Sequence, residues 1–512
     1  MASDTRSQEL FGHPKGLYVC FFTEMWERFS FYGMKALLFL YLTKYHLFGD
    51  EPSYDLLGAY GGLVYAMPVL GGLLADRFLG MRKAVVFGGT LLVLGHFGMA
   101  FEGTQATSAD GVVQQDTGAL QIFYLSLSLI IMGVGFLKPN ISTIVGKLYP
   151  VGDPRRDSGF TIFYAGINLG AMFSSLVCGY LGETYGWRYG FGAAGIGMVA
   201  GLIVFVWGQR YLYGHAEPTR PEVLKEKLAG PLDREKSIYL GALLGVLVVW
   251  QLIQRTWTVH SAMHLVALGF FGWFLWFLGK RCTKEERHKM TVLIFIILAN
   301  LAFFALYEQT YGSWVAFTDR LLTKDLFGFT FTAGSLTFLG SLFIVALSPL
   351  FAWMWPALDR RGLNPSTGLK CAIGLLCGGL AFIPLALAAQ SYDGALQSVW
   401  WLVLAYLVLE VGELCLSPIG LSAVTSLSVP KVVSLMMGAW FLATAYSEVL
   451  AAVFGKLTAV EAEEGKAVDL AAAAARYGEV FWLMLGVGVA CAVLFALLTP
   501  LMNRWMRAAK AA

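Results

Sequence analysis

The sequence has few charged residues for its length. Asp, Glu, Lys and Arg make up 14% of its 512 residues, whereas they make up about a quarter of an ordinary soluble domain. Hydrophobic residues make up 57%, which is more than a single soluble core would bury. The formal net charge of +3 is too small to indicate a nucleic-acid partner. These properties predict an all-α protein that crosses a membrane many times.

Motifs of enzymes and of metal or nucleotide sites are also missing. The chain contains no GxxxxGK[ST] phosphate loop, no HExxH zinc motif and no glycine-rich dinucleotide fingerprint. Its seven cysteines are scattered, and none forms a CxxC pair. We therefore expect no enzyme activity, no metal, no cofactor and no energy supply from bound ATP. Residues 1–15 lack the apolar core and cleavage site of a signal peptide, so we expect the first span to stay as an anchor.

Apolar runs separated by polar turns predict about fourteen membrane-spanning helices, arranged as six, two and six. The predicted fold is two six-helix bundles with an inserted two-helix hairpin. The predicted domains are residues 1–214 for the first bundle, 215–285 for the linker and hairpin, and 286–512 for the second bundle. The predicted spans are 17–41, 55–75, 84–101, 119–146, 158–182, 188–212, 237–255, 262–280, 290–318, 328–355, 367–390, 398–428, 432–455 and 478–503.

Basic residues lie in alternate connections between these spans. Arg82 and Lys83 occupy one connection and Arg155 and Arg156 another, whereas residues 102–118 contain acidic residues and no Lys or Arg. Short loops rich in Lys and Arg stay in the cytoplasm. With an even number of spans, both termini are therefore predicted to be cytoplasmic.

The first span carries charges within an apolar run. Glu24, Glu27, Arg28 and Lys35 are spaced so that one helical face presents all four, and Tyr32 joins them. An ionised group at membrane depth costs at least about 2.5–3.5 kcal/mol, so such groups normally face a cavity and mark function. The alternative is a soluble helix with a solvated charged face, which the surrounding apolar residues disfavour.

Other charges stand deep in later spans. Lys138 lies in the fourth span, Glu308 in the ninth, and Glu413 in the twelfth, with Glu410 one turn before it. These residues come from both predicted bundles. Each is therefore a candidate for an ion pair or a ligand contact.

Depth along the spans predicts which opposite charges meet. Lys35 and Glu308 both fall in the outer half of the membrane, whereas Lys138 and Glu413 fall in the inner half, at 1.5 Å per residue. Lys138 is also level with the two carboxylates of the first span. Ion pairs that join the two bundles at two depths suit a protein that closes alternately outside and inside. The alternative is that each pair only neutralises a buried charge.

The same groups predict a ligand with both charges. The cations of the first bundle suit a carboxylate, and Glu413 on the second bundle suits an amine, so a zwitterion of a few residues would bridge them. Tyr164 and Asn168 offer a phenol and an amide to a peptide backbone. Tyr65 and Trp440 are candidates for the walls around variable side chains, although Trp440 is as well explained by core or lipid packing.

Two groups of motifs carry a family resemblance. The loop Gly72…Asp76-Arg77…Gly80 resembles the loop signature of the major facilitator superfamily, in which two helical halves form a transporter. The rest resembles the proton-coupled oligopeptide transporter family over nearly the whole chain, including the hairpin seen in bacterial members. The motifs that match are Glu24-x-x-Glu27-Arg28-Phe29, Phe31-Tyr32-Gly33, Lys138-Pro139-Asn140, Phe163-Tyr164-x-x-Ile167-Asn168-x-Gly170, Glu308-Gln309 and Gly412-Glu413-x-x-x-Ser417.

The resemblance implies a multi-pass protein of the bacterial inner membrane. It would take up di- and tripeptides with protons by alternating access, as a monomer, without a cofactor or a nucleic-acid partner. The implied proton-coupling residues are Glu24, Glu27, Arg28, Lys138 and Glu308. The implied substrate-binding residues are Lys35 and Lys138 for the peptide carboxylate and Glu413 for the amino terminus. The residues themselves add Tyr32, Tyr65, Tyr164, Asn168 and Trp440 as substrate-binding candidates. The implied outer gate is Lys35 with Glu308, and the depth of the spans adds Lys138 with Glu413 as the predicted inner gate.

The sequence also departs from the family pattern. Lys35 stands where the family often has an arginine. Lysine keeps the positive charge but cannot donate the bidentate hydrogen bonds of a guanidinium group. Phe31 replaces a tyrosine, and Phe304 a tryptophan. Family members carry an Asn-Pro pair in the helix that corresponds to span 328–355. Here Phe338-Leu-Gly340-Ser341 stands in its place, so an amide that could bind a peptide backbone is lost. The alternatives left open are the same machine carrying another anion or zwitterion, such as nitrate or an amino-acid conjugate, and a nutrient sensor that does not transport.

Overall fold

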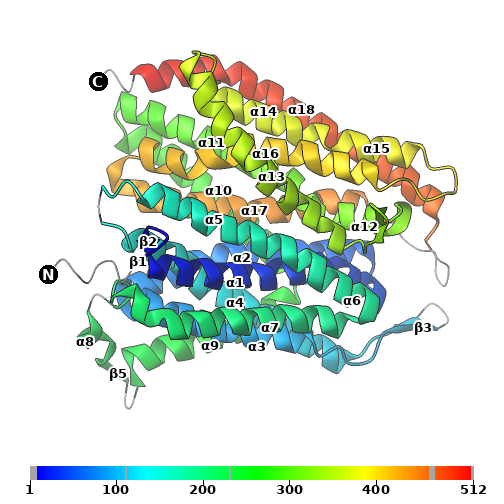
Figure 1. Ribbon diagram of the computed structural model, residues 1–512, viewed down its shortest axis with the longest axis horizontal. Helices are drawn as coiled ribbons and strands as arrows, with labels where there is room; N and C mark the ends of the chain where they lie inside the picture. The colour runs from blue at the N-terminus through cyan, green and yellow to red at the C-terminus, as the bar shows by residue number, and fades with distance from the viewer. Residues whose placement is uncertain are drawn as a thin grey trace.

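The computed structural model describes residues 9–109, 112–150, 152–218, 220–229, 232–460 and 468–508. Long helices run side by side through the whole molecule (Figure 1). In the described residues, twelve helical segments are long and apolar enough to cross a membrane. The charged residues of α1 (Lys15–Leu40) keep it out of that count, and α3 (Met81–Met99) is a further long helix outside it. Together they confirm the predicted all-α membrane fold with about fourteen spanning helices.

The helices fall into three consecutive groups. The first group is α1, α2 (Asp50–Leu74), α3, α4 (Thr117–Lys147), α5 (Arg156–Ser174), α6 (Tyr180–Tyr185) and α7 (Trp187–Gly208). The linker and hairpin contain α8 (Pro221–Leu224), α9 (Arg234–Ile253) and α10 (Thr256–Arg281). The last group is α11 (Lys284–Tyr307), α12 (Ser313–Leu321), α13 (Phe338–Arg360), α14 (Thr367–Leu380), α15 (Phe382–Gln390), α16 (Trp400–Leu427), α17 (Val433–Leu457) and α18 (Leu470–Ala508).

Shorter elements interrupt or connect these helices. Single π-helical turns form η2 (Tyr41–Tyr45), η3 (Ala75–Leu79) and η4 (Ser175–Gly179). Short 3-10 turns form η5 (Gln209–Leu212), η6 (Glu308–Tyr311), η7 (Ser335–Thr337) and η8 (Pro430–Val432). Four antiparallel two-stranded hairpins pair β1 (Glu9–Leu10) with β2 (His13–Pro14), β3 (Thr107–Ala109) with β4 (Val112–Gln114), β5 (Lys227–Ala229) with β6 (Leu232–Asp233), and β7 (Asp325–Leu326) with β8 (Phe329–Thr330).

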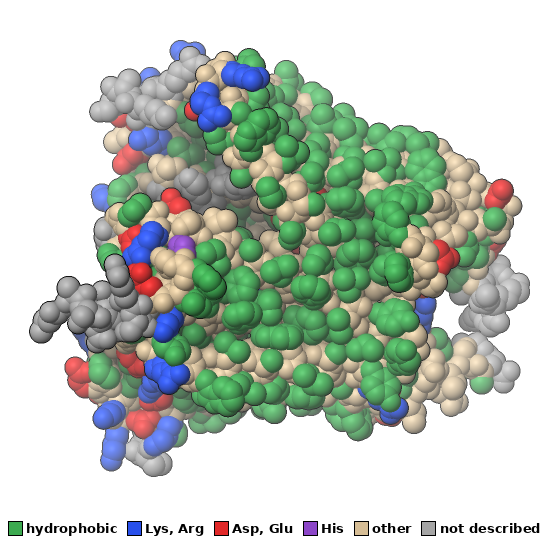
Figure 2. Space-filling view, viewed as in Figure 1, with side chains coloured by type: hydrophobic (Ala, Val, Ile, Leu, Met, Phe, Trp, Pro, Cys, Tyr) green, Lys and Arg blue, Asp and Glu red, His purple; other side chains and the backbone are tan. Residues whose placement is uncertain are grey.

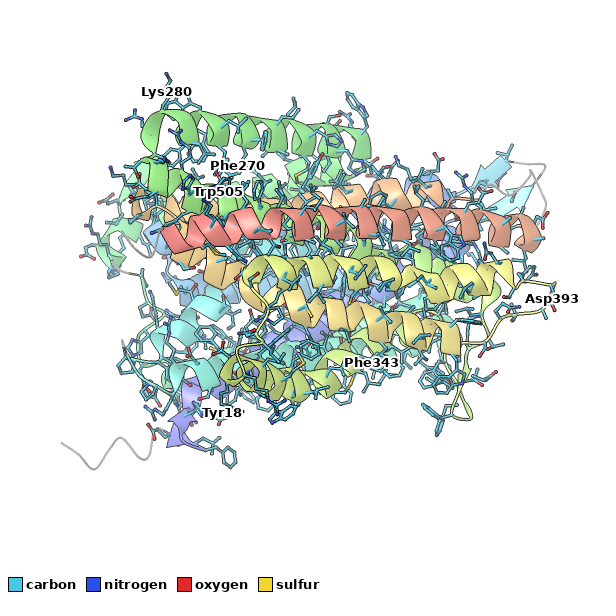
Figure 3. All side chains as sticks on the ribbon, turned by 90° about the horizontal axis from the view of Figure 1, so that it is seen from above. Tyr18, Phe270, Lys280, Phe343, Asp393 and Trp505 are labelled. Carbon is cyan, nitrogen blue, oxygen red and sulfur yellow. The ribbon has the colours of Figure 1, made fainter. Side chains whose placement is uncertain are left out.

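The two ends of the bundle differ in which parts of the chain they hold. Tyr18 near the start of α1, Lys280 near the end of α10 and Trp505 near the end of α18 lie at one end, and Asp393 lies at the other (Figure 3). We call these the terminal end and the far end. Hydrophobic side chains cover the flank of the bundle between them, and charged side chains gather mainly at the terminal end (Figure 2). This distribution fits an apolar bilayer around the middle of the bundle.

The long helices pack as two bundles with the hairpin at their side. In the first bundle α1 packs against α5 and α7, and α4 packs against α2 and α3. In the second bundle α14 packs against α16 and α18, and α11 packs against α17 and α18. The bundles meet where α2 contacts α17 and where α5 contacts α13. Within the hairpin, α9 packs on α4, whereas α10 reaches both α2 and α17.

Glycines of α2 show where the bundles approach each other. Near the far end, Gly58 faces Ala452 of α17, and a Cβ at Gly61 would overlap the Glu448 carboxyl group. Nearer the terminal end, Gly71 instead faces the Gly135 carbonyl of α4, inside its own bundle. Only a residue without a side chain permits such close helix contact. The contact between α2 and α17 is therefore closest toward the far end.

One predicted span starts later than expected. Residues 328–355 were predicted as a helix, but the strand hairpin β7–β8 and the turn η7 occupy its start, and α13 continues to Arg360. The reason is local, because Gly328 adopts a positive φ of 82° in the turn between the strands. A glycine turn of this kind favours a hairpin over a helix start.

Candidate functional site

A cluster of two carboxylates and one guanidinium lies inside α1. Arg28 Nε is 2.8 Å from Glu24 Oε1 and 2.8 Å from Glu27 Oε2. All three side chains are buried. Within the described part of the chain, Glu24 Oε2, Glu27 Oε1 and Arg28 Nη2 have no hydrogen-bond partner. The cluster therefore holds one more carboxylate than cation and leaves polar atoms unsatisfied, a state that a bound proton would relieve.

Lys138 lies on α4, immediately before the proline that interrupts the hydrogen bonding of this helix. Its Nζ atom is 4.0 Å from the centroid of the Tyr65 ring, a cation–π contact between α4 and α2. Among the described side chains, no ion pair joins Lys138 to Glu413 or to the carboxylates of α1. The predicted pair between Lys138 and Glu413 is therefore absent from this conformation. The physical reason is that the described polar bridges between the two bundles lie nearer the far end than these residues.

Lys35 joins the two bundles toward the far end. Its Nζ atom is 2.7 Å from Glu308 Oε2 at the start of η6 and 2.7 Å from Glu448 Oε1 in α17. The side chains of Lys35, Glu308 and Glu448 are 3%, 8% and 4% exposed, respectively. The contact predicted between Lys35 and Glu308 is thus present, whereas its function as a gate stays a prediction. The second acid, Glu448, was not predicted.

The sequence did contain a signal for Glu448. This residue lies within the apolar span 432–455, where the rule used for the other buried charges also applies. It follows Lys431 at the terminal end by seventeen positions, and at 1.5 Å per residue this depth is level with Lys35. Glu448 lies outside the motifs that carry the family resemblance, so its depth within an apolar span is the signal that the sequence offers for it.

A second pair of acids lies on α16. Glu410 is fully buried and accepts a hydrogen bond of 3.3 Å from the Tyr307 hydroxyl. Glu413 follows one turn later and interacts with Glu410. A Cβ at Gly340 of α13 would lie 2.8 Å from Glu410 Oε1. The glycine in the segment that departs from the family pattern therefore gives this carboxylate its space.

Aromatic rings surround the charged residues of α1. The Tyr32 ring stacks on Tyr311 of η6, with centroids 5.9 Å apart. The Phe31 ring lies 5.7 Å from the Arg28 guanidinium and 6.0 Å from Lys35 Nζ. These contacts give both cations partial stabilisation without a hydroxyl at position 31.

The remaining predicted ligand residues differ in exposure. Tyr164 of α5 is 51% exposed, and its carbonyl accepts a hydrogen bond of 3.1 Å from Asn168 Nδ2. Trp440 of α17 is only 8% exposed, and a Cβ at Gly420 of α16 would overlap its ring. In this conformation Trp440 therefore packs between helices, and its proposed contact with a ligand stays a prediction.

Further polar contacts close the far end. Arg320 of α12 donates two hydrogen bonds, 2.7 and 2.6 Å long, to the Asp50 carboxylate at the start of α2. Lys44 pairs with Asp319 at 2.6 Å, and the Gly334 N–H donates to Glu183 at 2.7 Å. Sequence reasoning missed these bridges, because their residues lie at helix ends where charges are ordinary.

The described part of the site combines four features. The buried cluster of α1 holds two carboxylates and one guanidinium. Lys138 has no ion pair with a described acid, and Glu410 and Glu413 lie on the opposite bundle. Ion pairs such as those of Lys35 join the two bundles at the far end. Among the described residues, no group of three His, Cys, Asp or Glu side chains is arranged to hold a metal ion. This arrangement can bind a ligand with separated charges and can exchange protons.

Known proteins resemble the chain in sequence and in fold. The model of the POT family matches residues 82–471. An uncharacterized transporter of Bacillus subtilis, YclF, is 37% identical, covering 86% of this chain and 87% of its own. The peptide transporter YePEPT of Yersinia enterocolitica is 34% identical, covering 87% and 88%.

A solved structure matches along almost the whole chain. It is a mutant of the peptide transporter POT crystallised in complex with alafosfalin, with 33% sequence identity and a TM-score of 0.81. The match covers 97% of this chain and 96% of that chain. The family model and these relatives together show that the chain belongs to the POT family.

Proposed function

We propose that this protein is a symporter that takes up di- and tripeptides together with protons by alternating access. The observation that carries the proposal is the placement of Lys138 on the first bundle and Glu413 on the second, without an ion pair between them. Lys138 and Glu413 are both half-buried. A cation and an acid at membrane depth on separate bundles are costly unless a ligand or a proton satisfies them. A peptide has a positive amino end and a negative carboxyl end, so it satisfies both.

The peptide would lie across the two bundles. Glu413 receives its amino terminus, and Lys138, assisted by Lys35 once the far end opens, receives its carboxylate. Tyr32, Tyr65, Tyr164 and Asn168 supply hydroxyl and amide groups for the peptide bonds. Trp440 contributes an apolar wall after the bundles rearrange.

The proton would bind at the α1 cluster. Protonation of Glu24 or Glu27 removes one acid from Arg28, which changes the balance of charge that Arg28 and Lys138 present to a peptide carboxylate. Glu308 adds a further acid that is released when its contact with Lys35 breaks. Proton binding and peptide binding are then linked through shared cations.

The relatives support peptides as the substrate class. YePEPT and the solved structure are both named peptide transporters. We further propose that the protein works as a monomer in the bacterial plasma membrane with both termini in the cytoplasm, since short basic loops lie at the terminal end.

Uptake into vesicles tests the proposal. Vesicles containing the protein should concentrate labelled dialanine when the outside is made acidic, and unlabelled tripeptide should compete. Free alanine and nitrate should compete weakly. Strong competition by nitrate, or uptake that ignores the pH gradient, would redirect the proposal to another anion or to a protein without proton coupling.

Variants of the α1 cluster test the coupling site. Glu24→Gln and Glu27→Gln should each abolish uptake driven by the proton gradient, because the proton-binding carboxylate is gone. Both should retain exchange of labelled for unlabelled dialanine, since exchange needs no net proton movement. If both variants still concentrate dialanine under a pH gradient, the coupling site lies elsewhere.

A further inference from the structure

A groove runs along the outside of the first bundle, between α2 and α9 of the hairpin. Helix α9 packs mainly on α4, which forms the floor of the groove, and meets α2 only weakly. The cavity volume is about 590 Å³. Its walls are almost entirely apolar and include Leu63, Leu70, Met132, Phe136, Val248 and Leu252. At membrane depth, such a groove is open to the acyl chains of the bilayer.

The two walls of the groove stand apart from each other. Leu70 of α2 and Val248 of α9 are each 58% exposed, although both line the groove. Gly241 of α9 also lines it, and a Cβ at this position would have no described atom within 4 Å. The space between α2 and α9 is therefore wide enough to take additional apolar groups.

The groove has a charged residue at one end. Arg234 begins α9 and lines the groove at the terminal end. From Ile238 to Ile253 the same helix has no charged residue. The Ser237 hydroxyl, which also lies at this end, already donates to the Asp233 carbonyl at 2.8 Å. The Arg234 guanidinium therefore supplies the charged donor at the level where the apolar part of the bilayer meets its phosphate groups.

The contacts of Arg234 leave it able to bind an anion. Its Nη2 atom is 2.8 Å from Glu226 Oε2, and the Glu226 side chain is 56% exposed. Its guanidinium carbon lies 5.2 Å from the centroid of the Phe78 ring. The neighbouring Lys83 is instead paired with Glu235 at 2.6 Å. Because an exposed ion pair is weak and a guanidinium has five N–H donors, Arg234 can also bind a phosphate group.

The dimensions of the groove match one acyl chain. Leu63 and Leu74 of α2 both line it and are eleven positions apart, which corresponds to about 17 Å along the helix. The hydrocarbon layer of one leaflet is about 15 Å thick, half of the bilayer core. A helix about 10 Å wide would need roughly 1,300 Å³ over the same length, more than twice the volume of the groove. A helix of a second copy is therefore too wide to enter, whereas a single acyl chain fits.

We propose that this groove binds one phospholipid from the leaflet at the terminal end, with its phosphate on Arg234 and one acyl chain between α2 and α9. The apolar walls remove the chain from contact with other lipids, and the guanidinium donates hydrogen bonds to phosphate oxygens. The lipid then completes the weak contact between the hairpin and the first bundle. The site lies apart from the residues assigned to the peptide and the proton, so the inference does not depend on the proposed transport.

Native mass spectrometry of the purified protein in detergent measures this binding. In a titration with dioleoyl phosphatidylglycerol, one lipid should bind the wild type at least about tenfold more tightly than any further lipid. It should also bind at least about tenfold more tightly than dioleoylglycerol, which has the same acyl chains without the phosphate. Equal affinity of the two lipids for the wild type would overturn the proposed phosphate contact without the need for any variant.

Variants that fill the groove test where the acyl chain lies. Gly241→Phe should weaken binding of the first phosphatidylglycerol by at least about tenfold, because the ring occupies the place of the chain. Val248→Trp fills the groove from another position and keeps the test available if Gly241→Phe does not fold. The matched control is Gly272→Phe on α10, where a Cβ also has no described atom within 4 Å but which lies outside the groove. Wild-type affinity in a folded groove variant would overturn the proposal.

Removal of the guanidinium tests where the phosphate lies. Arg234→Gln should weaken binding of phosphatidylglycerol by at least about tenfold and leave binding of dioleoylglycerol unchanged. The matched control is Arg281→Gln at the end of α10, whose guanidinium lies 5.7 Å from the Trp276 ring. If Arg234→Gln has no larger effect than Arg281→Gln, Arg234 does not hold the phosphate. A wild-type dimer that Gly241→Phe dissociates would assign the groove to a second copy and overturn the proposal.

Discussion

Replacing Arg320 with methionine should favour opening of the far end. Arg320 holds Asp50 through two short hydrogen bonds, and the two side chains are only 15% and 5% exposed. Methionine keeps an unbranched side chain but removes the charge. Asp50 then keeps only the Val460 N–H, at 3.1 Å, among its described partners from the second bundle.

The size of the effect follows from the burial of this pair. Two unit charges about 4 Å apart attract by about 4 kcal/mol at an effective dielectric constant of about 20. Removing one partner of a buried pair costs about 3–5 kcal/mol, because the other charge is left unpaired. The slight exposure of Arg320 favours the lower value of about 3 kcal/mol. At about 1.4 kcal/mol per factor of ten, this is roughly a hundredfold shift toward the far-end-open state.

The penalty falls on the closed conformation, because Asp50 meets water once the bundles separate. Spin labels can be attached at Tyr185 of α6 and Phe327 of the β7–β8 turn, whose side chains are 64% and 80% exposed. Opening would appear as a larger fraction of molecules with a long distance between the two labels. Lys44→Met is a matched control. It breaks the neighbouring ion pair between Lys44 and Asp319, in which the Lys44 side chain is 45% exposed. An exposed pair contributes at most about 1 kcal/mol, so the control should shift the ratio only several-fold.

The double variant Asp50→Asn/Arg320→Met should recover part of the closed population, because it leaves no unpaired charge. If Arg320→Met shifts the ratio no more than Lys44→Met does, the buried pair does not hold the far end closed. The same conclusion follows if the double variant opens more than Arg320→Met.

Two further predictions concern the ligand and a helix start. Acetylation of the dialanine amino group should weaken binding to the wild type by tens- to thousands-fold, from a cost of about 2–5 kcal/mol, and should weaken binding to Glu413→Gln little further. Additive losses in a binding titration of the four combinations would place the amine elsewhere, with Glu410 the next candidate. Backbone N–H groups of Ala119 and Thr104 hold the pKa of Asp116, which caps α4, below its ordinary value of 3.8. The same hydrogen bonds stabilise the ionised carboxylate in the folded state, so they contribute to stability above pH 3.8. This contribution is lost as the pH falls through the lowered pKa. Over that range the Tm of the wild type should therefore drop more than the Tm of Asp116→Asn.

Much of the fold could be predicted from the sequence alone. Apolar runs of sufficient length must form helices in a bilayer, because the backbone has no other hydrogen-bond partner there. The buried stripe of Glu24, Glu27 and Arg28 also follows from spacing along one helix. These properties are local, so the order of residues determines them.

Only the tertiary structure decided which distant groups meet. The choice of partner depends on the rotation and depth of helices that are far apart in the chain, and on which end of the bundles is closed. Lys35 therefore acquired Glu448 in addition to the expected Glu308, whereas Lys138 faces Tyr65 and has no ion pair with Glu413. The bridge between Arg320 and Asp50 also exists only because the two bundles meet at the far end, which brings charges at the ends of α12 and α2 within hydrogen-bond distance.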